Sequence, residues 1–155
     1  CWASGQVLAR YLLDNPSCVA GRCVVDVGPG SGVVAIAAAM AGARKVIACD
    51  LDEDALTATA MNARENGVDV SLSNDLSAAL QEADLTTAAD ILYDRDNLPL
   101  LAQLQLASAV LLADSRVPDL NPPGYRLLGE WESCTWPDLG ESQEYNHVRL
   151  FASEP

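Results

Sequence analysis

The chain has 155 residues, half of them hydrophobic, and a formal net charge of −13. This length fits one domain with a buried core, and no apolar run approaches the roughly 18 residues that a membrane-spanning helix needs. A chain with this much negative charge repels phosphate backbones. We therefore expect neither nucleic acid as a substrate nor the membrane as a partner.

The charge is unevenly distributed. Residues 1–49 carry two acidic and four basic side chains, whereas residues 50–155 carry 20 acidic side chains and five arginines. A surface of this kind attracts basic partners, although it can also serve solubility alone. We expect a monomer whose partner is a basic or lysine-bearing protein.

The cysteines and the start of the chain indicate the cellular setting. Five cysteines without a C-x-x-C pair, together with one histidine, favour neither a metal site nor a disulfide framework. The chain begins at Cys1 instead of Met and shows no basic, apolar leader. We therefore expect a cytoplasmic protein with an incomplete N-terminus.

Helical and strand-like segments alternate along the chain. Helices are predicted at residues 4–15, 31–41, 53–66, 76–81 and 97–106, with Asp52 as the cap of the third. Strands are predicted at 23–27, 46–49, 68–72, 85–89 and 109–113 and, after the turn at Asn121-Pro122-Pro123-Gly124, at 125–133 and 146–152.

Strands separated by helices of this length predict a parallel sheet with right-handed crossovers. The helix-free end of the chain predicts an antiparallel hairpin at one edge. The fold class is therefore α/β, a Rossmann-like doubly wound, mostly parallel seven-stranded sheet with a C-terminal antiparallel hairpin, in one domain over residues 1–155.

A glycine-rich turn follows the first predicted strand. The sequence Val24-Val-Asp-Val-Gly-Pro-Gly-Ser-Gly32 precedes a helical run, and Asp50 comes 22 residues after Gly28, at the end of the second strand. Such a turn presents backbone N–H groups and the positive end of a helix to a ligand, which predicts a nucleotide-type cofactor site. The plainer alternative is a strand-turn-helix unit in which the glycines serve geometry alone.

The spacing separates two cofactor classes. A dinucleotide site favours G-x-G-x-x-G, but here Val33 stands where the last glycine would be. Asp26 would repel a pyrophosphate and attract the ammonium group of a methionine moiety. Asp50 suits the two ribose hydroxyls. These residues favour S-adenosylmethionine over NAD.

Together these features resemble a class I S-adenosylmethionine-dependent methyltransferase. More narrowly, the chain is similar to seven-β-strand lysine methyltransferases, especially bacterial relatives of the enzyme that acts on the electron-transfer flavoprotein β subunit, which are often described as nicotinamide N-methyltransferase-like. The narrower likeness rests on residues 2–6, 8–16, 62–67, 90–93 and 114–116.

The resemblance implies roles for a set of cofactor-binding residues. Gly28 and Gly30 let the backbone approach the methionine portion near Asp26, Asp50 takes the ribose, Leu51 packs on the adenine, and Asp75 accepts the adenine amino group. Trp2 and Ser4 belong to a segment that closes over the cofactor, unless Trp2 simply fills the core.

The same resemblance places the acceptor at Asp90 and Tyr93, the D-x-x-Y element after the fourth strand, as the catalytic pair. The alternative is that Asp90 caps a helix and Tyr93 lies on an amphipathic face. We expect protein lysine N-methylation. A small-molecule N-methyltransferase and a non-catalytic S-adenosylmethionine-binding protein remain open.

Overall fold

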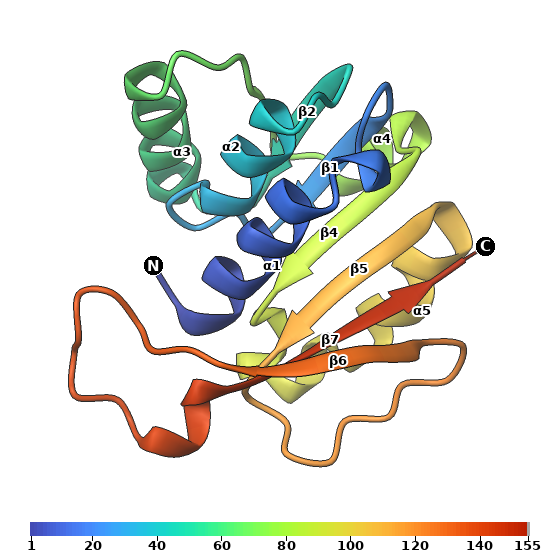
Figure 1. Ribbon diagram of the computed structural model, residues 1–155. Helices are drawn as coiled ribbons and strands as arrows, with labels where there is room; N and C mark the ends of the chain where they lie inside the picture. The colour runs from blue at the N-terminus through green and yellow to red at the C-terminus, as the bar shows by residue number, and fades with distance from the viewer. Residues whose placement is uncertain (155) are drawn as a thin grey trace.

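The computed structural model describes residues 1–154 and contains one seven-stranded sheet (Figure 1). The strand order is β3-β2-β1-β4-β5-β7-β6; neighbours are parallel from β3 to β5, and β7 runs antiparallel to both β5 and β6. The strands are β1 (Cys23–Val27), β2 (Lys45–Cys49), β3 (Ser71–Ser73), β4 (Leu85–Ala89), β5 (Ala109–Asp114), β6 (Arg126–Glu132) and β7 (His147–Ser153). The predicted fold class is confirmed.

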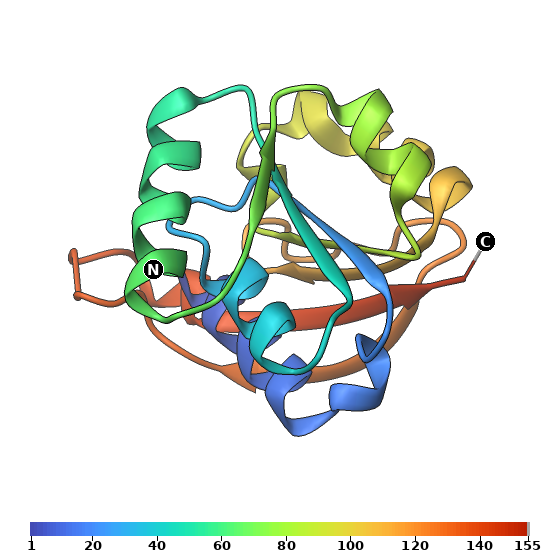
Figure 2. The same ribbon diagram turned by 90° about the horizontal axis from the view of Figure 1, so that it is seen from above.

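Helices cover both faces of the sheet. The first three, α1 (Ala3–Asp14), α2 (Val33–Met40) and α3 (Glu53–Glu65), lie on one side, and α4 (Leu76–Glu82) and α5 (Leu98–Ala107) lie on the other (Figures 1 and 2). Within residues 1–154, no helix is long and apolar enough to cross a membrane.

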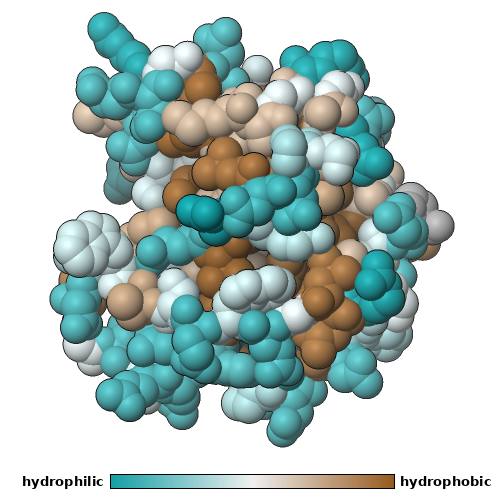
Figure 3. Space-filling model, viewed as in Figure 1, coloured by the Kyte–Doolittle hydropathy of each residue, from teal (hydrophilic) through white to brown (hydrophobic). Residues whose placement is uncertain are grey.

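The core is divided into two apolar layers by the sheet. Alternate side chains of the strands point to opposite faces, so Val24 and Val46 pack with α1 and α2, whereas Val25 and Ile47 pack with the layer under α4 and α5. Every residue of β1 and β5 is buried, as expected for strands covered on both faces. Apolar residues also gather in the middle of the face shown in Figure 3, between hydrophilic areas above and below.

The observed elements follow the predicted ones closely, with two informative differences. The second helix begins at Val33, not at residue 31, because Gly32 adopts a left-handed conformation with φ of 86° that a helix cannot contain. The third strand is only Ser71–Ser73. Asp52 caps α3 as predicted, with its side chain accepting from the Asp54 N–H at 2.9 Å.

Candidate active site

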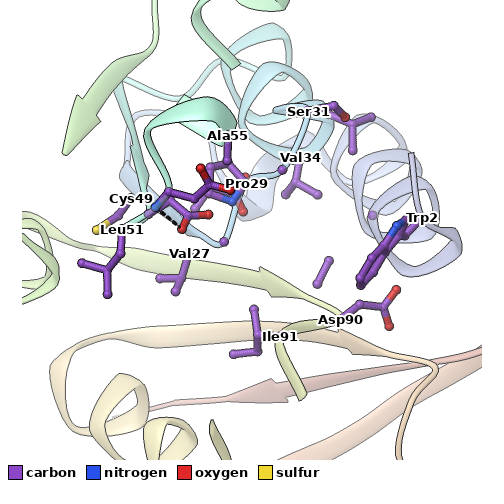
Figure 4. Close-up of a pocket in the computed structure, with 18 of the residues that line it drawn as sticks. Trp2, Val27, Pro29, Ser31, Val34, Cys49, Leu51, Ala55, Asp90 and Ile91 are labelled. Carbon is purple, nitrogen blue, oxygen red and sulfur yellow. Dashed lines mark hydrogen bonds between the residues drawn. The ribbon is translucent and has the colours of Figure 1, made fainter. Parts of the chain in front are cut away.

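A cavity of about 780 Å³ opens where β1, β2, β3 and β4 end (Figure 4). The carboxyl ends of parallel strands meet at one edge of a sheet, where open α/β folds bind ligands. Here the turns after four strands and the N-terminal segment share one wall. The predicted site residues that line it are Trp2, Asp26, Gly28, Gly30, Asp50, Leu51, Asp90 and Tyr93.

The glycine turn exposes its main chain to the cavity. Gly28 and Gly30 have φ of 67° and 55°, values that favour glycine. A Cβ built at Gly30 would meet nothing within 4 Å, whereas one at Gly28 would lie 3.1 Å from Cγ2 of Ile91. The backbone at Gly30 is therefore open to a ligand.

Asp26 is a buried carboxylate on the same wall. Its Oδ1 accepts from the Thr87 hydroxyl at 2.8 Å, and its Oδ2 has no partner among the described residues. Burial raises the pKa of Asp26 to about 7, and the Thr87 hydroxyl and the Ala35 backbone oppose that rise. An ammonium group entering the cavity would supply the missing partner.

Leu51 lies at the opposite end of the cavity from Trp2 (Figure 4), and the preceding residue, Asp50, also lines the cavity. One oxygen of Asp50 accepts from the Asp52 N–H at 3.0 Å, which leaves further acceptor capacity on this carboxylate. Leu51 is 87% exposed and offers an apolar surface without a covering side chain.

This donor and acceptor set fits S-adenosylmethionine. The unpartnered oxygen of Asp26 suits the ammonium of its methionine portion, the carboxylate of Asp50 suits the ribose hydroxyls, and Leu51 suits the adenine. The cavity volume falls within the usual range for cofactor sites. The glycine turn between Asp26 and Asp50 lets the ligand approach the main chain.

Asp90 lies beneath Trp2, at the other end of the cavity (Figure 4). Of residues 1–154, it is the only non-glycine residue with a positive φ, 52°, a conformation that costs energy and clusters at functional sites. Its side chain is 2% exposed. Oδ1 accepts three hydrogen bonds, whereas Oδ2 has no hydrogen-bond donor within the described part of the chain.

Aromatic side chains surround this end of the cavity. The Trp2 and Tyr93 rings meet edge to face with centroids 6.1 Å apart. The Arg116 guanidinium lies over both the Trp2 and the Tyr145 rings and pairs with Glu141 at 3.1 Å. Trp2 is 41% exposed, so it forms part of the mouth and does not fill the core.

Two predicted cofactor residues lie elsewhere. Ser4 is fully buried and absent from the cavity wall, because its hydroxyl donates to Asp90 at 2.6 Å. Asp75 caps α4 by accepting from the Ala78 N–H at 3.0 Å, while Asn74 and Leu76 line the cavity in its place.

Sequence reasoning missed several functional neighbours. The N-cap preference of aspartate before a helix was the available signal that Asn74, not Asp75, lines the cavity. Nothing local marked Thr87 as the partner of Asp26, or Ser115 as a partner of Asp90.

A profile of the family described as "Ribosomal protein L11 methyltransferase (PrmA)" matches residues 8–95, more than half of the chain. The chain belongs to this family. The matched range contains the glycine turn, Asp50, Asp90 and Tyr93. Membership of a methyltransferase family agrees with S-adenosylmethionine as the cofactor.

Individual relatives support the same assignment. The electron transfer flavoprotein beta subunit lysine methyltransferase of Mus musculus is 44% identical over 98 residues, which are 61% of this chain and 38% of the mouse protein. This chain therefore matches less than two fifths of that relative's length.

Solved structures confirm the fold. Ribosomal protein L11 methylase from Lactobacillus delbrueckii subsp. bulgaricus superposes with a TM-score of 0.71 at 24% identity, over 96% of this chain and 78% of that one. Magnesium protoporphyrin IX methyltransferase from Synechocystis PCC 6803, solved with bound SAH, gives 0.69 at 16% identity, over 96% and 80%.

Proposed function

We propose that this chain transfers a methyl group from S-adenosylmethionine to the ε-amino group of a lysine on a partner protein. The observation that carries the proposal is that Asp90 lines the cavity near Trp2 (Figure 4) and has a buried oxygen, Oδ2, without a hydrogen-bond partner among residues 1–154. The likeness to the mouse lysine methyltransferase supports a protein acceptor.

S-adenosylmethionine supplies a methyl group that its sulfonium already activates, so positioning matters more than acid–base chemistry. In this chain Asp26 would bind the ammonium of the cofactor and Asp50 its ribose. These contacts hold the cofactor along the edge of the sheet between Leu51 and Trp2.

The acceptor side must bind an amine and then let it lose a proton. A lysine side chain arrives charged, since its ordinary pKa is about 10.4. Oδ2 of Asp90 would bind the ammonium, and the faces of Trp2 and Tyr93 would attract it as aromatic rings attract cations. Enclosure against these rings favours the neutral amine, and the released proton can leave to water through the open mouth.

The test is an incubation of the chain with S-adenosylmethionine labelled in its methyl group and one of three acceptors: electron-transfer flavoprotein β subunit, ribosomal protein L11 or nicotinamide. We expect label on lysine side chains of a protein acceptor, located by mass spectrometry, and its loss in Asp90→Asn. Label on nicotinamide alone would favour a small-molecule enzyme. Binding of the cofactor without labelling of any acceptor, or of host lysate, would contradict the proposal.

A further inference from the structure

We propose that Ser115 and Ser4 are positioning residues for the methyl acceptor, because they fix the orientation of the Asp90 carboxylate at one oxygen and leave the other without a partner among residues 1–154. This inference rests on the proposed function, in which Asp90 binds the acceptor amine. Neither serine lines the cavity, so each acts through Asp90.

The two serines bond to the same oxygen atom of Asp90. The Ser4 hydroxyl donates to Oδ1 at 2.6 Å, the Ser115 hydroxyl at 2.9 Å and the Ser115 backbone N–H at 3.0 Å. Three donors saturate Oδ1, whereas Oδ2 has none among residues 1–154. Rotation of the carboxylate would break all three hydrogen bonds.

Elements distant in sequence build this arrangement. Ser4 lies in the first turn of α1, which crosses β4 and β5, and Ser115 directly follows β5. The Asp114 carboxylate holds the turn after β5 by accepting from the N–H groups of Arg116 and Val117 at 3.1 and 2.9 Å. The Asp90 N–H also donates to the carbonyl of Ala113 at 3.0 Å, which fixes its backbone.

The consequence is an acceptor site that is oriented before the substrate arrives. A carboxylate with fixed geometry loses little freedom when an amine binds, and preorganised groups contribute most to positioning. Without the serine hydroxyls, only the Ser115 backbone N–H would hold Oδ1, and the carboxylate could turn toward the entering amine in more than one way.

The experiment is a double-mutant cycle in the full chain. It compares Ser4→Ala, Ser115→Ala, their combination, Asp90→Asn, and Asp90→Asn combined with each serine change. Ser108→Ala is the matched control, because Ser108 is also a buried serine, but it lies just before β5 and bonds to Thr86 at 2.7 Å. The acceptor is electron-transfer flavoprotein β subunit, or ribosomal protein L11 if only that is labelled.

Four quantities are measured: kcat and KM for the acceptor, the Kd of S-adenosylhomocysteine by calorimetry, and acceptor affinity in the presence of S-adenosylhomocysteine. We expect the double serine variant to lose about 10- to 100-fold in kcat/KM and to bind the acceptor more weakly. The Kd of S-adenosylhomocysteine should change less than about twofold. On the Asp90→Asn background, each serine change should have almost no further effect, since it acts through Asp90. If the double variant does not fold, Ser115→Ala alone carries the same test with about a several-fold loss.

The possible failures are distinguishable. If the unmodified chain labels no lysine, the proposed function fails and the inference fails with it. If Asp90→Asn abolishes labelling but the serine changes are harmless, the inference alone is overturned. The inference is also overturned if the losses of kcat/KM in the serine variants add fully to the loss in Asp90→Asn. The same holds if Ser108→Ala causes an equal loss, because the serines would then contribute to stability only.

Discussion

The guanidinium carbon of Arg116 lies 4.4 Å from the centroid of the Trp2 ring, so the turn after β5 holds the N-terminal segment against the mouth of the cavity. The centroid of the Tyr145 ring lies 4.3 Å from the same guanidinium carbon. Glu141 balances the charge of Arg116, so this arginine can lie near a site for ammonium groups.

Replacing Arg116 with alanine should therefore loosen Trp2. A cation–π contact contributes roughly 0.5–2 kcal/mol, so we expect KM for the acceptor to rise about 2- to 30-fold in Arg116→Ala, measured by steady-state kinetics. Arg126→Ala, which removes an exposed arginine of β6, is the control. An equal effect in both variants would point to net charge and not to stacking.

Asp26 should make cofactor binding depend on pH. With its pKa raised to about 7 by burial, the carboxyl is protonated in more acidic solution and cannot pair with an ammonium. We expect the Kd of S-adenosylhomocysteine, measured by calorimetry, to rise roughly 10- to 30-fold from pH 7.5 to 5.5, with proton release on binding. Thr87→Val should move the transition to higher pH, and Asp26→Asn should remove it.

The same group affects folding with the opposite sign. Because its pKa is higher in the folded protein than the ordinary 3.8, Asp26 contributes stability that is fully present below pH 3.8 and is lost as pH rises through about 7. Urea unfolding of the chain and of Asp26→Asn across this range should show the difference; parallel curves would contradict it.

Asp50→Ala should specifically weaken binding of the cofactor. It removes an acceptor for the ribose hydroxyls, each charge-assisted hydrogen bond contributing about 1.5–3 kcal/mol at most. Calorimetry with S-adenosylhomocysteine should show this loss, whereas Asp54→Ala, on the exposed first turn of α3, should leave affinity nearly unchanged.

Tyr93 should contribute mainly through its ring. It is 69% exposed and meets Trp2 edge to face, so Tyr93→Phe should keep most of kcat/KM while Tyr93→Ala raises KM for the acceptor severalfold. If Phe and Ala reduce kcat/KM equally, the hydroxyl has a role that the contact with Trp2 does not explain.

Gly32→Ala tests the close contact between the glycine turn and α3. Its Cβ would lie 2.8 Å from Cγ2 of Thr59, at a φ of 86°, so we expect a loss of about 1–3 kcal/mol in the free energy of unfolding. Gly42→Ala shares the positive φ but meets nothing within 4 Å, and should cost less. Chemical denaturation measures both.

Local sequence was sufficient to predict that the glycine turn, Asp26 and Asp50 line one cavity, although Ser4 and Asp75, predicted with them, do not. The glycine turn, Asp26 and Asp50 each lie at the end of a single strand, so their spacing in the sequence is enough to locate them at the edge of the sheet. Pairs such as Ser115 with Asp90 could not be predicted, because they meet only when β4 and β5 become neighbours in the sheet. Ser4 joins them from 86 residues away.

The segment between β6 and β7 is tied to the start of the chain, since the Trp136 N–H donates to the carbonyl of Cys1 and the Gln6 amide to that of Cys134. Both this segment and the turn after β5 lie outside residues 8–95, the range that the family profile matches. Changes in these two segments could therefore alter which acceptor is methylated, while the residues that bind the cofactor stay the same. Grafting them between relatives is the corresponding route to altered specificity.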